Sequence, residues 1–371
     1  LFEGKGTEQN PYIISSYDDL AKLSDLTNSK RETFKDKFFK QTDDIIYYDY
    51  YNSWIAIKDF EGTYDGNGKT VVNVLGIFNN LKGTVKNLSV ENIYYSNDVT
   101  ERDFGVLANK TEGKIIKCHI KGVNLNVTDG FRTGLIVGSL KNGGLIENCS
   151  AEGSIDGKST YLGGIVGQSY GEVKGCIFSG KLNTTNGLAG GIVGEGGGGI
   201  SNCSSSGEFS GYTAGGIVGR TNSTVENCYS TAKLSGTYVG GILGTPQFLS
   251  GLATVKNCYY LGKDMIIGDY NAGGIVSSSY GKEARVKVEN CIALIENINS
   301  SSRSNRIGHY METKNNNYAW SGMKVKGSVV TDGALNNDNG ADVELVDGKV
   351  YYNNAEFDWG ANGFTEENGW I

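Results

Sequence analysis

Seven cysteines recur along the chain at intervals of 25 to 33 residues, and their thiols are its most reactive side chains. A structural zinc site would need ligand pairs at CxxC spacing, which the sequence lacks. Thiols stacked on neighbouring strands would lie about 4.8 Å apart, whereas a disulfide prefers a Cβ separation of about 3.8 Å. Leu88 occupies the same place one unit earlier, so the position accepts a buried hydrophobe. We therefore predict a structural column of reduced, buried thiols at Cys118, Cys149, Cys176, Cys203, Cys228, Cys258 and Cys291.

Five aromatic residues form a second set, because each stands two or three residues before a glycine pair. On neighbouring strands their rings would form a strip along one face of the protein. The strip is either a packing ladder or, if the rings face water, a surface that binds sugars or a partner protein. The ligand-binding candidates are Phe131, Tyr161, Tyr212, Tyr238 and Tyr270. A denser group is interpreted as edge-strand packing: Tyr47, Tyr48, Tyr50 and Tyr51.

The sequence offers little for catalysis. Its two histidines, His119 and His309, lie in unrelated settings, which disfavours a zinc site or a Ser-His-Asp triad. Enzymes that cleave polysaccharides need two or three converging carboxylates, and the aligned repeats contain no column of Asp or Glu. We predict no catalytic residue, no metal and no cofactor. The segment 336–342 is rich in oxygen ligands that suit calcium but does not match the EF-hand spacing.

The elements that must position these residues come from a repeat. The phrase Gly-Gly-Ile-Val-Gly occurs at Gly163–Gly167, Gly190–Gly194 and Gly215–Gly219, and with Leu for Val at Gly240–Gly244. Self-similarity at this period is typical of solenoids, and short β-branched stretches between glycines indicate short strands joined by tight turns. We predict an all-β fold: one parallel β-helix of about nine rungs, right-handed by the general rule for parallel crossovers.

A column of bends should run along one corner of this helix. An isoleucine or valine precedes each cysteine by three residues, and an odd offset cannot keep both side chains on one face of a flat strand. The residue directly before the cysteine is usually asparagine, exchanging once with Gly175 and once with Lys117. Asparagine and glycine tolerate positive φ best. We predict left-handed bend residues at Asn148, Asn202, Asn227, Asn257 and Asn290.

Three segments are expected to form one continuous unit. Residues 1–73 are predicted to be a cap and lead-in, with a capping box at Ser16 and Asp19 before leucines at helical spacing. Residues 74–320 carry the repeats, with insertions at 245–252 and 278–285. Residues 321–371, together with Trp320, are predicted to close the far end through Trp320, Trp359 and Trp370.

The composition of the chain argues against two kinds of partner, nucleic acids and the interior of a membrane. The chain has 371 residues and a formal net charge of −7, without the clustered basic residues that nucleic-acid binding needs. No apolar run approaches the length of a membrane span. We expect a monomer. The sequence begins at Leu1 rather than at a methionine, so the lack of a leader says nothing about the compartment.

The glycine phrase, followed by an apolar residue and Asn-Cys, resembles the GLUG motif of bacterial surface and secreted proteins. The opening, with Asn10-Pro11-Tyr12-Ile13-Ile14 and Asp65-Gly66-Asn67-Gly68, is similar to the lead-in of such repeats in Bacteroidetes and some Gram-positive bacteria. The likeness covers about residues 4–320. It implies an extracellular parallel β-helix, adhesin-like, secreted or anchored at the outer membrane as a lipoprotein, and it implies no catalytic residue.

The resulting expectation is a non-enzymatic cell-surface module that binds a glycan or a host or matrix protein. A secreted polysaccharide-cleaving enzyme on the same fold and a purely structural spacer remain alternatives. A groove with converging carboxylates would favour the enzyme, and an aromatic-lined face would favour binding.

Overall fold

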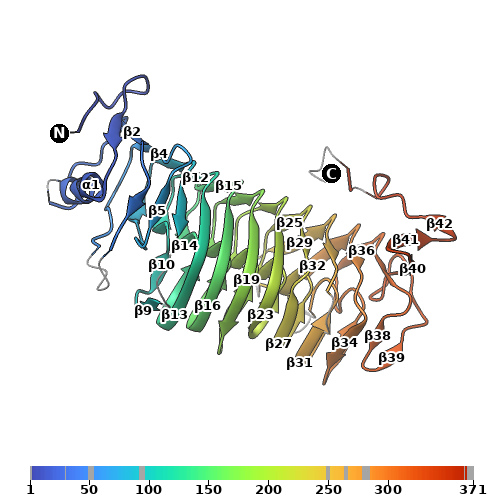
Figure 1. The fold of residues 1–371 in the computed structure, drawn as a ribbon. Coiled ribbons are helices and arrows are strands. Elements are labelled where there is room, and N and C mark those ends of the chain that lie inside the picture. Colours follow the sequence, from blue (N-terminus) through green and yellow to red (C-terminus); the bar gives the residue numbers. More distant parts are fainter. Residues whose placement is uncertain are drawn as a thin grey trace.

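The computed structural model describes residues 2–29, 31–48, 54–91, 97–247, 251–262, 266–277, 285–362 and 364–365. The chain winds into an elongated parallel β-helix of about eleven turns, with one helix at the N-terminal end (Figure 1). The expected all-β parallel solenoid is thus confirmed. Three sheets run along its length.

The first sheet has twelve strands, each paired with the strand of the next turn. They are β1 (Tyr12–Ile14), β2 (Phe38–Gln41), β4 (Thr63–Asp65), β7 (Thr84–Lys86), β12 (Lys114–Ile116), β15 (Leu145–Glu147), β18 (Glu172–Lys174), β22 (Ile200–Ser201), β25 (Thr224–Glu226), β29 (Leu252–Lys256), β32 (Arg285–Glu289) and β36 (Thr313–Asn315).

The second sheet is the largest and carries the strand that begins directly after each cysteine, which is long in the first four repeats and short in the last three. Its parallel part consists of β3 (Ile45–Ile46), β5 (Thr70–Val72), β8 (Ser89–Glu91), β9 (Asn97–Val99), β10 (Asp103–Gly105), β13 (His119–Gly134), β16 (Ser150–Gly163), β19 (Ile177–Thr184), β20 (Leu188–Gly190), β23 (Ser204–Gly215), β26 (Tyr229–Ser230), β27 (Lys233–Gly240), β30 (Tyr259–Tyr260), β31 (Ile266–Gly273), β33 (Ile292–Ala293), β34 (Asn297–Ser300), β35 (Arg303–Asn305) and β37 (Tyr318–Trp320). Two further strands pair in parallel with this part, β38 (Lys324–Val325) with β34 and β40 (Ala341–Val346) with β37. Antiparallel pairs then add β39 (Ser328–Val329), β41 (Lys349–Tyr352) and β42 (Ala355–Glu356).

The third sheet has seven strands and begins just after the bend in each glycine phrase. They are β6 (Phe78–Leu81), β11 (Ala108–Thr111), β14 (Val137–Leu140), β17 (Val166–Ser169), β21 (Val193–Gly196), β24 (Val218–Thr221) and β28 (Leu243–Pro246). The closing glycines let this sheet approach the second one closely. A Cβ on Gly167 would lie 2.5 Å from the Thr133 backbone nitrogen, and one on Gly194 would lie 2.6 Å from that of Leu162.

The expected count of about nine rungs is wrong, because both ends of the helix continue without the repeat phrase. Phe39 and Tyr64 take the inward position that Val85 and Ile115 hold in later rungs, and they pair with them in register. Both aromatic rings are buried. The first rungs are therefore filled by aromatic rather than β-branched side chains, which hides them from a search for the repeat.

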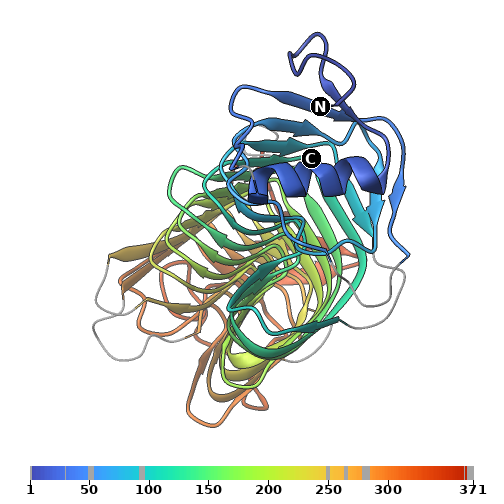
Figure 2. The same cartoon turned by 90° about the vertical axis from the view of Figure 1, so that its left-hand side faces the viewer.

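The N-terminal cap matches its prediction. Helix α1 (Tyr17–Ser29) lies across the end of the coil (Figure 2). The Asp19 amide donates to Ser16 Oγ at 3.2 Å, and the Asp19 carboxylate accepts from the Ser15 amide at 3.0 Å. Leu20 and Leu23 are buried in the main core. The helix therefore covers strand edges and core that would otherwise face water.

The column of left-handed bends is confirmed. Each predicted asparagine has φ between 51° and 54°, and Lys117 and Gly175 share the conformation at 53° and 64°. The column extends to Asn87 and Asn316. It also carries a ladder of side-chain amides, in which Asn257 donates to Asn227 at 3.1 Å and Asn290 donates to Asn257 at 3.1 Å. The amides thus bond between rungs while their backbones turn the corner.

The cysteine column is confirmed as well. All seven thiols are free and buried. The amide of Cys203 donates to the sulfur of Cys228 at 3.4 Å, as that of Cys176 does to Cys203. Leu88 ends the column on one side. On the other side the column ends at the buried Asn317, whose side-chain oxygen accepts a hydrogen bond from the Cys291 amide at 3.0 Å.

We expect these thiols to be unreactive in the folded protein, because all seven are buried where a reagent in solution cannot reach them. Burial also raises the pKa of Cys203, Cys228 and Cys258, which keeps these three protonated. Titration with Ellman's reagent at pH 8 should modify none of the seven in the native chain and all seven in guanidinium chloride. Rapid modification of even one thiol without denaturant would contradict the sealed column.

The C-terminal segment closes the far end around a second hydrophobic cluster, which joins Ile292 and Tyr318 of the last rungs to Val343, Val350 and Phe357. Trp359 and Trp320 pack against this cluster, as predicted, whereas Trp370 lies outside the described residues.

The oxygen-rich segment 336–342 is held by cationic side chains. The Asp338 carboxylate forms an ion pair with Lys314 Nζ at 2.6 Å, and the Asp342 carboxylate forms one with Nη2 of the fully buried Arg306 at 2.7 Å.

The insertions fall mostly outside the described residues, as do Tyr50 and Tyr51. Thr245 and Pro246 belong to β28, and Leu252 begins β29. Tyr47 is buried and stacks on Tyr17 with 4.3 Å between ring centroids.

Candidate functional site

Two rows of side chains face each other where the second and third sheets meet. One row lies near the ends of the second-sheet strands and reads Arg132, Tyr161, Leu188, Thr213 and Tyr238, one residue per rung in register. The other row lies on the third sheet and reads Lys110, Ser139, Gln168, Glu195, Arg220 and Thr245. Because Arg132 bonds to Gln168 and the Arg220 guanidinium lies 5.9 Å from the Tyr161 ring, side chains reach across the corner between the sheets.

The predicted aromatic strip is broken into two groups. Phe131 and Tyr161 are in contact, with ring centroids 5.0 Å apart. Tyr238 contacts Tyr212 at 5.5 Å and Tyr270 at 5.8 Å. The rung between the groups carries Leu188 instead of an aromatic residue. The strip therefore has a gap that is one rung wide.

The five aromatic candidates differ in exposure, so they cannot play the same part. Tyr212 and Tyr270 are 42% and 46% exposed, whereas Tyr238 is 3% exposed. Phe131 and Tyr161 are half-buried. Tyr238 therefore supports its neighbours by packing, and Tyr161 and Tyr212 are the rings that border the gap.

The gap opens a groove of about 300 Å³, which we call the aromatic groove. It is lined by Thr160, Tyr161, Asn186, Gly187, Leu188, Tyr212, Thr213, Arg220, Tyr238 and Thr245. Its volume lies at the lower end of the range for small-molecule sites. Leu188 is buried between the two aromatic groups, so the lining combines an apolar residue and aromatic rings with amide, hydroxyl and guanidinium groups.

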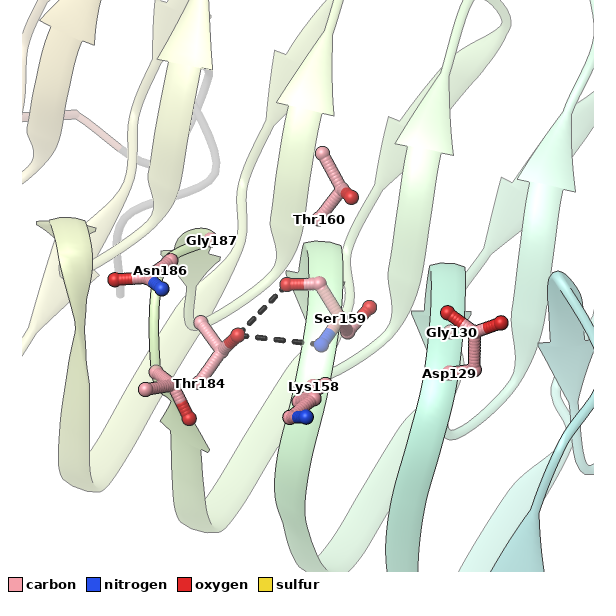
Figure 3. A pocket seen from close by; sticks show the side chains of 9 residues that line it. Asp129, Gly130, Lys158, Ser159, Thr160, Thr184, Asn186 and Gly187 are labelled. Carbon is pink, nitrogen blue, oxygen red and sulfur yellow. Dashed lines mark hydrogen bonds between the residues drawn. The ribbon is translucent and has the colours of Figure 1, made fainter.

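A smaller polar hollow of about 230 Å³ adjoins the groove and shares Thr160, Asn186 and Gly187 with it (Figure 3). It lies where β13 shifts register against β16 and where the chain leaves the sheet between β19 and β20. The Thr184 hydroxyl ties the neighbouring rung by donating to the Ser159 carbonyl at 2.7 Å. Asp129 and Lys158 stand at this hollow (Figure 3).

A line of charge-assisted hydrogen bonds fixes the third-sheet side of the groove. Glu195 accepts from the Arg220 Nη2 at 2.5 Å and from the Gln168 amide at 2.5 Å. Gln168 in turn accepts from Arg132, which pairs with Asp103 at 2.8 Å. Such bonds are stronger than neutral ones, so Arg220 is held in place before any ligand arrives.

The electrostatics leave the groove without an evident acid–base pair. Burial and the neighbouring Glu195 carboxylate raise the pKa of Tyr161, so its phenol is neutral at physiological pH. The Glu195 carboxylate is engaged by Arg220 and Gln168, and Asp103 by Arg132 and Lys110. Both carboxylates therefore serve to orient basic side chains.

The two histidines lie in separate parts of the structure. His119 contacts Ser150 Oγ at 2.8 Å, and His309 lies 3.4 Å from Asp338 at the C-terminal closure. Among the described residues, no three His, Cys, Asp or Glu side chains gather in a way that could hold a metal ion. No helix in the described part of the chain has the length and apolar character to cross a bilayer.

Sequence reasoning found the aromatic side of the groove but missed its polar side. Gln168, Glu195 and Arg220 each stand one residue after the closing glycine of a repeat, and this constant offset is a signal that the sequence does contain. Their meeting with the aromatic row depends on the sharp turn between the two sheets, which the repeat alone does not reveal.

Comparison with known proteins shows to which motif the repeat is similar. The sequence model of the GLUG motif matches residues 129–156 and 210–235. The chain therefore carries GLUG repeats, as the resemblance implied. Both matches contain residues beside the groove, Asp129 in the first and Tyr212 in the second.

Two similar proteins give context. Halomucin from Haloquadratum walsbyi is 28% identical over 179 residues, which is 42% of this chain and 2% of halomucin. The chain thus spans a very small part of that relative. A solved structure from Bacteroides ovatus, described as a candidate immunoglobulin A1 protease, has a TM-score of 0.45 and 22% identity, and the match covers 92% of this chain and 87% of that one.

Proposed function

We propose that this chain is a non-catalytic binding module of an extracellular or cell-surface protein, and that the aromatic groove binds carbohydrate. The observation that carries the proposal is the groove itself, where Tyr161 and Tyr212 flank a buried leucine and Arg220, Asn186 and threonine hydroxyls stand beside them. Sugar rings offer an apolar face to aromatic rings and hydroxyls to such polar groups.

The location outside the cell is supported by the GLUG repeats, which resemble those of bacterial surface and secreted proteins, and by the likeness to halomucin. The β-helix suits that setting, because a long solenoid presents an extended rigid surface to a partner. Adhesion is one use of such a module.

The non-catalytic part of the proposal is supported by the carboxylates at the corner. Glycoside cleavage needs one carboxyl group as general acid and a second that either activates a water or attacks the sugar directly. Glu195 and Asp103 instead hold arginines in place. The rival hypothesis, a polysaccharide-cleaving enzyme, predicts that a bound glycan is consumed.

The test is a glycan-array screen of the purified chain beside Tyr212→Ala and Tyr48→Ala. Tyr48 is 71% exposed and does not line the groove, so its removal controls for loss of any surface tyrosine. We expect the parent chain and Tyr48→Ala to bind the same glycans, and Tyr212→Ala to lose about fivefold in affinity, because stacking contacts of this kind contribute about 1 kcal/mol.

Circular dichroism should show an unchanged fold in all three proteins. Release of reducing ends from the bound glycan would support the enzyme instead. No binding across the array would contradict the proposal and favour a protein partner or a spacer.

A further inference from the structure

We infer that the aromatic groove takes an unbranched, extended polysaccharide that lies along the helix axis, with successive sugar residues on successive rungs. The inference rests on the proposed function and adds the shape and the direction of the ligand. Its starting point is the register of the residues that line the groove.

The lining repeats with the rungs and not around a single point. Tyr161 pairs with Leu188, Leu188 with Thr213, and Thr213 with Tyr238, so four consecutive rungs each place a lining residue in the same register. On the facing sheet Glu195, Arg220 and Thr245 are in register in the same way. Three rung steps at about 4.8 Å each give about 14 Å of groove. A compact monosaccharide would fill only part of it.

The spacing favours a chain of sugars over a peptide. One pyranose residue of an extended, equatorially linked polysaccharide advances by about the length of one rung. An extended peptide advances by about 3.3 Å per residue, so its side chains would drift out of phase with the rungs. A glycan can therefore repeat the same contacts at each step.

The shape of the lining favours a flat ribbon. Tyr161 and Tyr212 stand two rungs apart, at about 9.6 Å along the axis, with the buried Leu188 between them. A β-1,4-linked chain presents broad apolar faces to such a surface. An α-1,4-linked chain coils and would lift off it after one or two residues.

Polar groups along both sides of the groove can form hydrogen bonds with the hydroxyls of such a chain. The Arg220 guanidinium is held by Glu195 and still borders the groove. Asn186 and Thr160 line both the groove and the adjoining polar hollow, so the binding surface continues past the Tyr161 rung. Fixed polar groups of this kind add specificity at little entropic cost.

The test is isothermal titration calorimetry of the full chain with β-1,4-linked oligosaccharides of two to six residues, using cello-, manno- and chito-oligosaccharides, against maltohexaose as the α-linked control. For at least one β-linked series we expect affinity to rise at least about tenfold from the disaccharide to the tetrasaccharide and less than about twofold beyond it. Maltohexaose should bind at least about tenfold more weakly than its β-linked counterpart.

Two variants test whether the dependence of affinity on oligosaccharide length arises in the aromatic groove. Tyr212→Ala should bring the tetrasaccharide down to the affinity of the disaccharide, while Tyr48→Ala should leave the series unchanged. Equal affinity for di- and tetrasaccharide, or for α- and β-linked hexasaccharides, would overturn the axial chain and leave carbohydrate binding standing. Failure of every oligosaccharide, together with a blank glycan array, would overturn both.

Discussion

Replacing Gly190 with alanine will abolish or severely destabilise the folded β-helix. A Cβ at this position would lie 1.9 Å from the Val193 carbonyl oxygen and 2.6 Å from the Gly219 backbone nitrogen. Both are backbone atoms, which cannot move aside as a flexible side chain would. We expect a loss of more than about 4 kcal/mol in the free energy of unfolding, measured by guanidinium denaturation, or failure to yield soluble protein.

The matched control is Gly199→Ala. This glycine belongs to the same repeat, but a Cβ on it would have no neighbour within 4 Å, and its φ is not in the left-handed region. We expect its stability to change by no more than about 0.5 kcal/mol, or to rise slightly because alanine restricts the unfolded chain. If both variants were equally stable, close packing of the glycine corner would be the wrong explanation for the repeat.

Replacing Arg306 with alanine should open the C-terminal closure. This side chain is fully buried, donates to the carbonyls of Asn339, Gly340 and Trp320 at 2.8 to 3.2 Å, and pairs with Asp342. Its removal leaves the buried carbonyls of Asn339 and Gly340 without this donor, and each buried acceptor left unsatisfied costs about 1–3 kcal/mol. The Asp342 carboxylate is half exposed, so loss of the ion pair itself costs little. Hydrogen exchange of residues 332–345 should rise steeply, and trypsin should cut at the C-terminal end first.

Arg285→Ala is the control for that experiment. Arg285 also binds a carboxylate, that of Glu312, but the pair is exposed to solvent. Exposed pairs contribute little, so exchange at the C-terminal end should be the same as in the parent chain. Equal protection of residues 332–345 in Arg306→Ala and the parent chain would show that the closure does not depend on the buried arginine.

Much of the fold could be predicted from the sequence, because the relevant rules act within a few residues. The exchange of Asn148 with Gly175 indicated a positive φ, and even Lys117 adopts it. The exchange of cysteine with Leu88 indicated a buried apolar column, which the structure shows.

The groove could be predicted only in part, because it depends on contacts between rungs and between sheets. The aromatic residues were visible, but the strip is interrupted at Leu188, where the chain leaves the sheet between Thr184 and Leu188. That interruption creates the cavity. The line from Arg132 to Glu195 and Arg220 joins two sheets, and no rule about neighbouring residues links them.

The rung count failed for a related reason. Large aromatic side chains such as Phe39 and Tyr64 fill the first rungs and replace the β-branched residues of the repeat. Rungs were recognised by their residues, whereas the backbone continues the same winding with different ones.

The most direct test of the central claim is a crystal structure of the chain soaked with the tightest-binding glycan from the array, at a concentration well above its dissociation constant. We predict sugar residues in the aromatic groove, stacked on Tyr212 and Tyr161 over Leu188 and bonded to Arg220, with the chain running along the helix axis. A glycan bound at another face, with the groove open to water, would contradict the assignment of this groove as the binding site.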